Sequence, residues 1–128
     1  MNGFSSDVIS ILKTNGVLER EGAGLIFTDT SSDAGDLFET LLKDKYVVAN
    51  KRTKIVFNYD YVIIPKGWNW EVLLYAFSVV SIGGAIVLEV SKFWQDRYVS
   101  RFGEFTGTKV KYGDNYYLVI KNGLDYGN

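Results

Sequence analysis

The chain has no cysteine and no histidine among its 128 residues. Without cysteine it can form no disulfide, no thiolate nucleophile and no cysteine-based metal site. Without histidine it lacks the usual general base, the most common metal ligand and any Ser-His-Asp triad. Any catalysis would therefore depend on carboxylates, lysine, tyrosine, hydroxyl groups or a bound cofactor, and no catalytic residue can be assigned.

Excess charge and a targeting segment are also missing. The formal net charge is -1, which gives no electrostatic footprint for nucleic acid or an anionic membrane. The basic stretch from Lys43 to Lys54 could touch phosphate, but scattered surface charge of this kind favours a solvated strand edge. The first residues lack the basic and apolar regions of a signal peptide, so we expect a cytoplasmic location.

One uncharged run, from Val72 to Leu88, is either a membrane span or the buried middle of a globular domain. A spanning helix needs about 20 mostly apolar residues, and this run is shorter and contains serine and glycine. Its first part is rich in helix-forming residues and its last part in β-branched ones. We therefore predict a buried helix over Trp70–Ile82, a stop at Gly83 and Gly84, and a buried strand over Ala85–Val90.

The same reasoning predicts the other elements along the chain. In chain order they are a helix over Ser6–Thr14 capped by Ser5 or Ser6 and ended by Asn15-Gly16, a strand around Leu25–Phe27, a helix capped by Ser32 or Asp33, a strand over Tyr46–Asn50, a strand over Asp60–Pro65, a helix capped by Ser91 and stopped by Gly103, and a terminal hairpin around Tyr112–Asn115. Lys54–Phe57 fits either a separate strand or the arm of a hairpin.

Alternating helices and apolar strands predict an α/β fold. We expect a three-layer α/β/α, Rossmann-like sheet that is mainly parallel and carries a C-terminal antiparallel hairpin. No linker, repeat or low-complexity segment interrupts the sequence. We therefore expect residues 1–128 to form a single domain.

The elements predicted between Tyr59 and Lys121 follow one another in an order that also occurs in a known protein family. The strand "YDYVIIP" is followed by the helix "NWEVLLYAFSVVSIGG", the strand "AIVLEV", a further helix and a terminal pair of strands. In this order the segment resembles the second half of class I S-adenosylmethionine-dependent methyltransferases. The resemblance implies a Rossmann-like domain related to those enzymes.

The resemblance also implies where a cofactor would bind, and there the sequence departs from the family. The family has a glycine-rich turn after its first strand, where this chain has Thr28 to Asp33, and an acidic residue after its second strand, where this chain has Asn50. Only Lys51 to Asn58 stands where the family has a helix, a strand and a helix. We therefore expect a reduced, non-catalytic relative without bound cofactor, which serves as a protein-interaction or small-ligand module. The alternative is an S-adenosylmethionine-dependent methyltransferase relative with an unusual cofactor site.

Candidate ligand-binding residues follow the predicted strands, because ligands of open parallel sheets sit beyond the carboxyl ends of the strands. They are Thr28, Asp29, Thr30, Asp33, Asn50, Pro65, Lys66 and Trp68. The hydroxyls and carboxylates of the first group suit a hydrogen-bonded ligand, although helix capping explains the same residues.

Two further interpretations of these residues stay open. Lys66 could face an anion and Trp68 could stack on a planar ring, or Trp68 and Trp70 could seal the core. Asp29 and Asp33 carry oxygen ligands suited to Mg²⁺, but their spacing is not diagnostic, and we expect no metal site.

The expected partners are proteins. Tyr112, Tyr116 and Tyr117 of the terminal hairpin suit a protein contact, although ordinary strand propensity also explains them. The shortened middle of the chain leaves one face of the sheet to be covered by the Ser6–Thr14 helix or by a second copy of the protein. We expect a homodimer that uses the region of Lys45–Phe57 or the hairpin.

Overall fold

The computed structural model describes residues 3–17, 24–27, 46–49, 58–65, 70–98, 101–102 and 105–123, with the backbone alone for 46–49 and 101–102. The described helices are α1 (Gly3–Thr14), α3 (Trp70–Val79) and α4 (Lys92–Arg97). The strands are β1 (Gly24–Phe27), β2 (Tyr46–Ala49), β3 (Tyr59–Ile64), β4 (Val80–Val90), β5 (Arg101–Phe102), β6 (Phe105–Tyr112) and β7 (Asn115–Asn122). The predicted helix after Asp33 and the Lys54–Phe57 segment lie outside the described residues.

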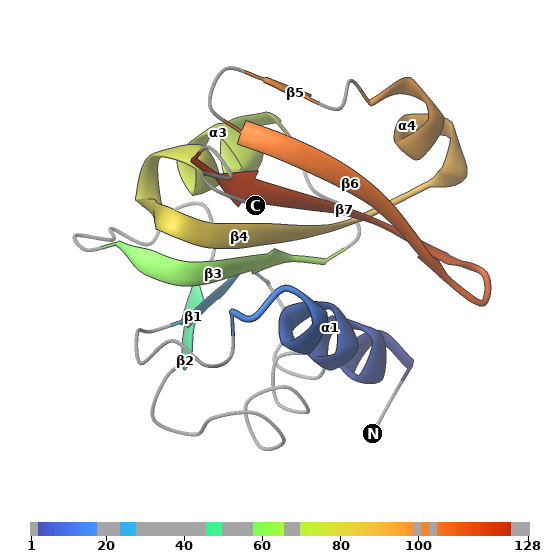
Figure 1. Ribbon diagram of the computed structural model, residues 1–128, viewed down its shortest axis with the longest axis horizontal. Helices are drawn as coiled ribbons and strands as arrows, with labels where there is room; N and C mark the ends of the chain where they lie inside the picture. The colour runs from blue at the N-terminus through green and yellow to red at the C-terminus, as the bar shows by residue number, and fades with distance from the viewer. Residues whose placement is uncertain are drawn as a thin grey trace.

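The strands form one mixed sheet in the order β2-β1-β3-β4-β7-β6-β5 (Figure 1). The three pairs among β2, β1, β3 and β4 are parallel, and the three pairs among β4, β7, β6 and β5 are antiparallel. The predicted α/β class and C-terminal hairpin are confirmed. The expectation of a mainly parallel sheet is confirmed only in part, because half of the pairings are antiparallel.

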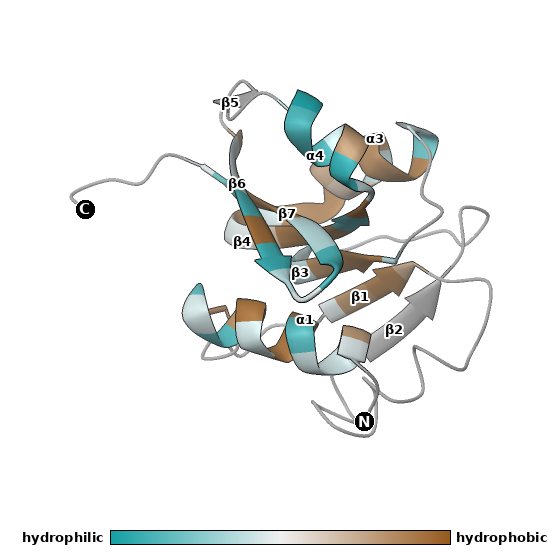
Figure 2. Ribbon diagram, turned by 90° about the vertical axis from the view of Figure 1, so that its right-hand side faces the viewer, coloured by the Kyte–Doolittle hydropathy of each residue, from teal (hydrophilic) through white to brown (hydrophobic). Residues whose placement is uncertain are grey.

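Helix α1 covers one face of the sheet (Figure 2). Val8, Ile11 and Leu12 pack on a buried cluster that includes Tyr61 and Tyr117. The helix begins at Gly3, so the prediction that Ser5 or Ser6 caps it is wrong. A contact with the sheet accounts for the earlier start of the helix. The centroid of the Phe4 ring lies 6.5 Å from the centroid of the Tyr117 ring. The predicted end is confirmed, since Gly16 has φ 70°. Helix α1 therefore covers this face, as one of the two alternatives from the sequence predicted.

A polar contact fixes α1 to the sheet. The Tyr117 hydroxyl donates a 2.8 Å hydrogen bond to Asp7 Oδ2, and Asn115 Nδ2 donates to the same oxygen at 3.3 Å. Burial raises the pKa of Tyr117 above its ordinary value, and the bond to Asp7 raises it further. Tyr117 is thus a neutral donor in the folded protein at physiological pH.

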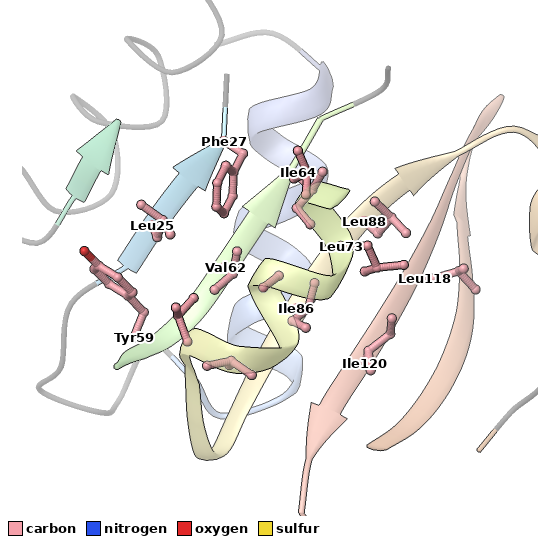
Figure 3. Packing of buried hydrophobic residues seen from close by; sticks show 14 of the residues in the cluster. Leu25, Phe27, Tyr59, Val62, Ile64, Leu73, Ile86, Leu88, Leu118 and Ile120 are labelled. Atoms are coloured by element: carbon pink, nitrogen blue, oxygen red, sulfur yellow. The ribbon is translucent and has the colours of Figure 1, made fainter. Parts of the chain in front are cut away.

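Helices α3 and α4 cover the opposite face (Figure 2). Figure 3 shows the core of this face, where Leu73 of α3 lies over Leu88 of β4 and Leu118 of β7. Helix α4 is fixed by Gln95, whose Nε2 donates to the carbonyls of Val110 and Tyr117 at 2.9 and 3.0 Å. The predicted cap of α4 is confirmed, because the Ser91 side chain accepts from the Trp94 amide. In the described part of the chain, no helix is long and apolar enough to cross a membrane.

The boundary between α3 and β4 differs from the prediction. The helix ends at Val79, and the strand begins at Val80 rather than Ala85. The sheet provides partners for the early part of the strand: Val80 lies opposite Tyr59, and the Val80 carbonyl accepts from Asn122 Nδ2 at 2.9 Å. Gly83 has φ 84° and so adopts the left-handed region, but it lies in an irregular stretch of β4 and not at a helix end.

Helix α4 also ends earlier than predicted, at Arg97 instead of near Gly103. At Tyr98 the backbone becomes extended, with φ -69° and ψ 134°. The Tyr98 ring packs so closely on Gly107 of β6 that a β-carbon there would lie 2.1 Å from it. This contact explains the turn, because a continuing helix would carry the ring away from β6. Tyr98 thus packs on the core of the sheet, whereas Phe93 and Trp94 of the same segment are exposed.

Candidate ligand site at the strand ends

The parallel strands bring their carboxyl ends to one edge of the sheet. Phe27, the last residue of β1, lies opposite Ala49, the last residue of β2. In β3 the register places Ile63 beside Ile26, so β3 ends at the same edge. The predicted binding segments follow these ends directly. The carboxyl ends of β1, β2 and β3 therefore meet at one edge of the sheet, and the ligand site expected there stays a prediction.

Of the predicted site residues, the structure describes only Pro65, which follows β3 and is half-buried. The others lie outside the described residues: Thr28, Asp29, Thr30, Asp33, Asn50, Lys66 and Trp68. Their proposed contacts with a ligand remain predictions. Trp70 is described, and the prediction that it helps to seal the core is wrong, since the residue is 60% exposed.

A cavity of about 300 Å³ lies between the end of β1 and helix α3. Phe27 forms its sheet side (Figure 3), and the rings of Phe27 and Tyr75 meet edge to face with their centroids 5.9 Å apart. Val72 and Leu74 add apolar wall. A planar ring could pack against these aromatic and aliphatic surfaces, because offset and edge contacts between rings are favourable.

Two polar side chains line the same cavity, Glu71 and Ser78. The Ser78 hydroxyl donates a 2.6 Å hydrogen bond to the Tyr75 carbonyl, so its oxygen can accept one from a ligand. Glu71 is exposed in the first turn of α3. Its carboxylate can accept hydrogen bonds from ligand hydroxyls or attract a cation. The arrangement suits a ligand that combines a ring with hydroxyl groups or positive charge.

The described residues offer little for acid-base chemistry at this cavity. Tyr59 does not line the cavity, and burial, followed by the neighbouring Tyr75, raises its pKa above the ordinary value, which disfavours it as a base. No group of His, Cys, Asp and Glu that could hold a metal ion occurs in the described ranges. Glu71 is thus the one carboxylate that the described side chains place at the cavity.

Phe27, Glu71, Tyr75 and Ser78 were not identified as site residues from the sequence. A partial signal existed, because Glu71, Leu74, Tyr75 and Ser78 follow helical spacing and lie on a different face of α3 from the buried Val72, Leu73, Ala76 and Val79. What the spacing could not indicate was that this second face meets the end of β1. That contact depends on the strand order.

Solved structures with similar folds are methyltransferases. An O-methyltransferase family protein from Burkholderia thailandensis aligns with a TM-score of 0.60 and 11% identity over 95% of this chain and 57% of that one. The N-methyltransferase NodS from Bradyrhizobium japonicum aligns with a TM-score of 0.54 and 11% identity over 96% of this chain and 98% of that one. The fold is methyltransferase-like.

Another methyltransferase-like neighbour was solved with ligands. A 16S rRNA methyltransferase from T. thermophilus, in complex with AdoMet and guanosine, aligns with a TM-score of 0.59 and 10% identity. The alignment covers 95% of this chain and 43% of that one. No protein-family model matches the sequence, and no curated protein matches it either. At these identities the likeness establishes the methyltransferase-like fold alone.

Proposed function

We propose that this chain is a methyltransferase relative that binds S-adenosylmethionine at the carboxyl ends of β1, β2 and β3. The observation that carries the proposal is the cavity beside Phe27, which lies at the end of the first parallel strand of a methyltransferase-like sheet. This position agrees with the general rule for ligands of open α/β sheets. The proposal replaces the expectation of a non-catalytic module as the preferred function.

The residues at the cavity suit the chemistry of that cofactor. Phe27 and Tyr75 offer ring surfaces for the adenine, and Glu71 can accept from ribose hydroxyls or face the positive charge of the sulfonium. Once bound, the cofactor would supply an activated methyl group. The segment Thr28–Asp33 and Asn50 would complete the site from the strand ends, as the sequence predicts.

Isothermal titration calorimetry of the full chain with S-adenosylmethionine and with S-adenosylhomocysteine tests the proposal. We expect both to bind, and Glu71→Gln to weaken binding about tenfold, because it removes a charge-assisted hydrogen bond. Asp96→Asn is the matched control, since Asp96 is an exposed carboxylate on α4 that does not line the cavity. Absence of binding by the wild type at millimolar cofactor would refute the proposal.

A non-catalytic interaction module is a second candidate, favoured by the exposed apolar side chains of Trp70, Leu74, Ile82, Phe93 and Trp94. Exposed apolar clusters commonly mark sites of association. This candidate predicts self-association or partner binding without any effect of S-adenosylmethionine on thermal stability. The cytoplasmic location stays a prediction from the sequence.

A further inference from the structure

A second cavity, of about 290 Å³, lies between α3 and α4. Its floor is made by Leu88 of β4 and by Leu118 and Ile120 of β7, which Figure 3 shows on the face of the sheet that α3 covers. Between the two helices lies a part of the sheet that neither helix covers. We call this cavity the interhelical groove. It lies on the other side of α3 from the cavity at Phe27, and Leu74 is the lining residue that the two have in common.

The mouth of the interhelical groove is aromatic and exposed. Trp70 from α3 and Trp94 from α4 both line it, although the two residues are 60% and 46% exposed. Tryptophan is usually highly buried, since it gains more from burial than any smaller side chain. Two exposed tryptophans at the mouth of an apolar groove therefore indicate a surface that binds something.

One end of the groove carries polar groups from the last turn of α4. Among the described residues, the hydroxyl of Tyr98 is buried and has no hydrogen-bond partner. A buried hydroxyl without a partner is unfavourable, and this one is covered by β6 rather than open to the groove, because a β-carbon on Gly107 would lie 2.5 Å from its oxygen. Tyr98 itself lines the groove.

Arg97 lies beside Tyr98 and also lines the groove. Its guanidinium lies 3.4 Å from the centroid of the Phe93 ring and donates to the Phe93 carbonyl at 3.1 Å. In the described part of α4 the ion pair joins Lys92 and Asp96, and Arg97 has no carboxylate partner. The remaining N–H groups of its fork can therefore bind an acid.

We propose that the interhelical groove binds a small organic acid whose apolar, ring-containing body fills the groove and whose carboxylate meets Arg97 at its rim. The volume holds a body of roughly ten non-hydrogen atoms, if each takes about the 30 Å³ share of a water molecule. The leucines and isoleucine of the floor and the tryptophans of the mouth suit the body. The charge of Arg97 suits the acid group.

Larger occupants fit these observations less well. One turn of a helix about 10 Å across and about 5.4 Å in pitch occupies roughly 400 Å³. That is more than the groove's volume of about 290 Å³, so only single side chains of a protein partner would enter it. A membrane surface is disfavoured by the exposed, charged Lys92–Asp96 pair on α4. The site lies away from the strand ends, so the proposal does not depend on S-adenosylmethionine binding.

Calorimetry of the full chain with 2-naphthoate, and with 2-naphthalenemethanol as its neutral analogue, tests the proposal. We expect the acid to bind about fivefold more tightly than the alcohol. Arg97→Gln should abolish this preference, and Arg97→Lys should retain part of it. Tyr98→Phe should bind the acid as the wild type does, because the Tyr98 hydroxyl is buried against β6 and does not reach the groove.

Two control variants locate the site. Lys92→Gln removes the same charge from the same helix but does not touch the groove, and Glu71→Gln alters the cavity at Phe27. Both should bind 2-naphthoate as the wild type does, and thermal unfolding confirms that every variant is folded. No binding at millimolar 2-naphthoate, or equal weakening by Arg97→Gln and Lys92→Gln, would overturn the proposal. A dimer that buries Trp70 and Trp94 and excludes the probe would overturn it as well.

Discussion

Replacing Tyr98 by phenylalanine should stabilise the ligand-free protein, which is unusual for a substitution next to the core. The hydroxyl of Tyr98 is buried and has no hydrogen-bond partner among the described residues. Burying a hydroxyl without a partner costs about 1–3 kcal/mol. The void left by one oxygen atom, roughly 15 Å³, costs about 0.4 kcal/mol at ~24 cal/mol per Å³. The contact with Gly107 remains in the variant, because the ring carbons of Tyr98 themselves pack against this glycine.

The net change is a stabilisation of about 1 kcal/mol, equivalent to a rise in Tm of about 3–5 °C for a domain of this size. Urea denaturation at about 25 °C measures the free energy of unfolding directly, and an unchanged slope would show that the unfolded state is unaffected. Tyr112→Phe is the matched control. Tyr112 is half-buried at the end of β6, and we expect a change within about 0.5 kcal/mol.

Destabilisation of Tyr98→Phe by about 1 kcal/mol or more would refute the reasoning, because it would show that the hydroxyl has a partner that stabilises the fold. The same variant should bind 2-naphthoate as the wild type does, because the buried hydroxyl does not reach the groove.

Three other predictions test the fold and its assembly. Gly83→Ala should lower the free energy of unfolding by more than about 1 kcal/mol, because φ at this position is 84°. Gly84→Ala should lower it by about 1–3 kcal/mol, because the new β-carbon would lie 2.5 Å from the Asp60 carbonyl oxygen. Gly3→Ala, with open space around the added atom, should be neutral in the same urea melts. Above about pH 10 Tyr117 loses its phenolic proton in the unfolded chain but keeps it in the folded protein, so the free energy of unfolding should fall as pH rises. Tyr117→Phe should make this fall less steep by up to about 1.4 kcal/mol per pH unit. Light scattering coupled to size exclusion should give a dimer mass at micromolar concentration, whereas a monomer mass throughout a dilution series would remove the dimer and leave α1 as the cover of its sheet face.

The sequence by itself determined the elements whose cause is local. Continuous apolar runs predicted the buried strands β1, β3 and the second half of β4, because a parallel strand covered on both faces has no polar side. Ser91 predicted the start of α4, and the hairpin turn followed from Gly113, which adopts φ 57° between the paired residues Tyr112 and Asn115. The order of these elements also indicated the methyltransferase-like fold.

Tertiary structure decided what depends on neighbours that are distant in the sequence. The run after Val79 could continue a helix or begin a strand, and pairing with Tyr59 and Asn122 made it a strand. Helix α4 ended at Arg97 because the Tyr98 ring packs on Gly107, a contact with a strand formed later in the chain. The same reason applies to the two cavities. Phe27 meets Tyr75, and Arg97 lies beside an apolar groove, only because the strand order places the helices there.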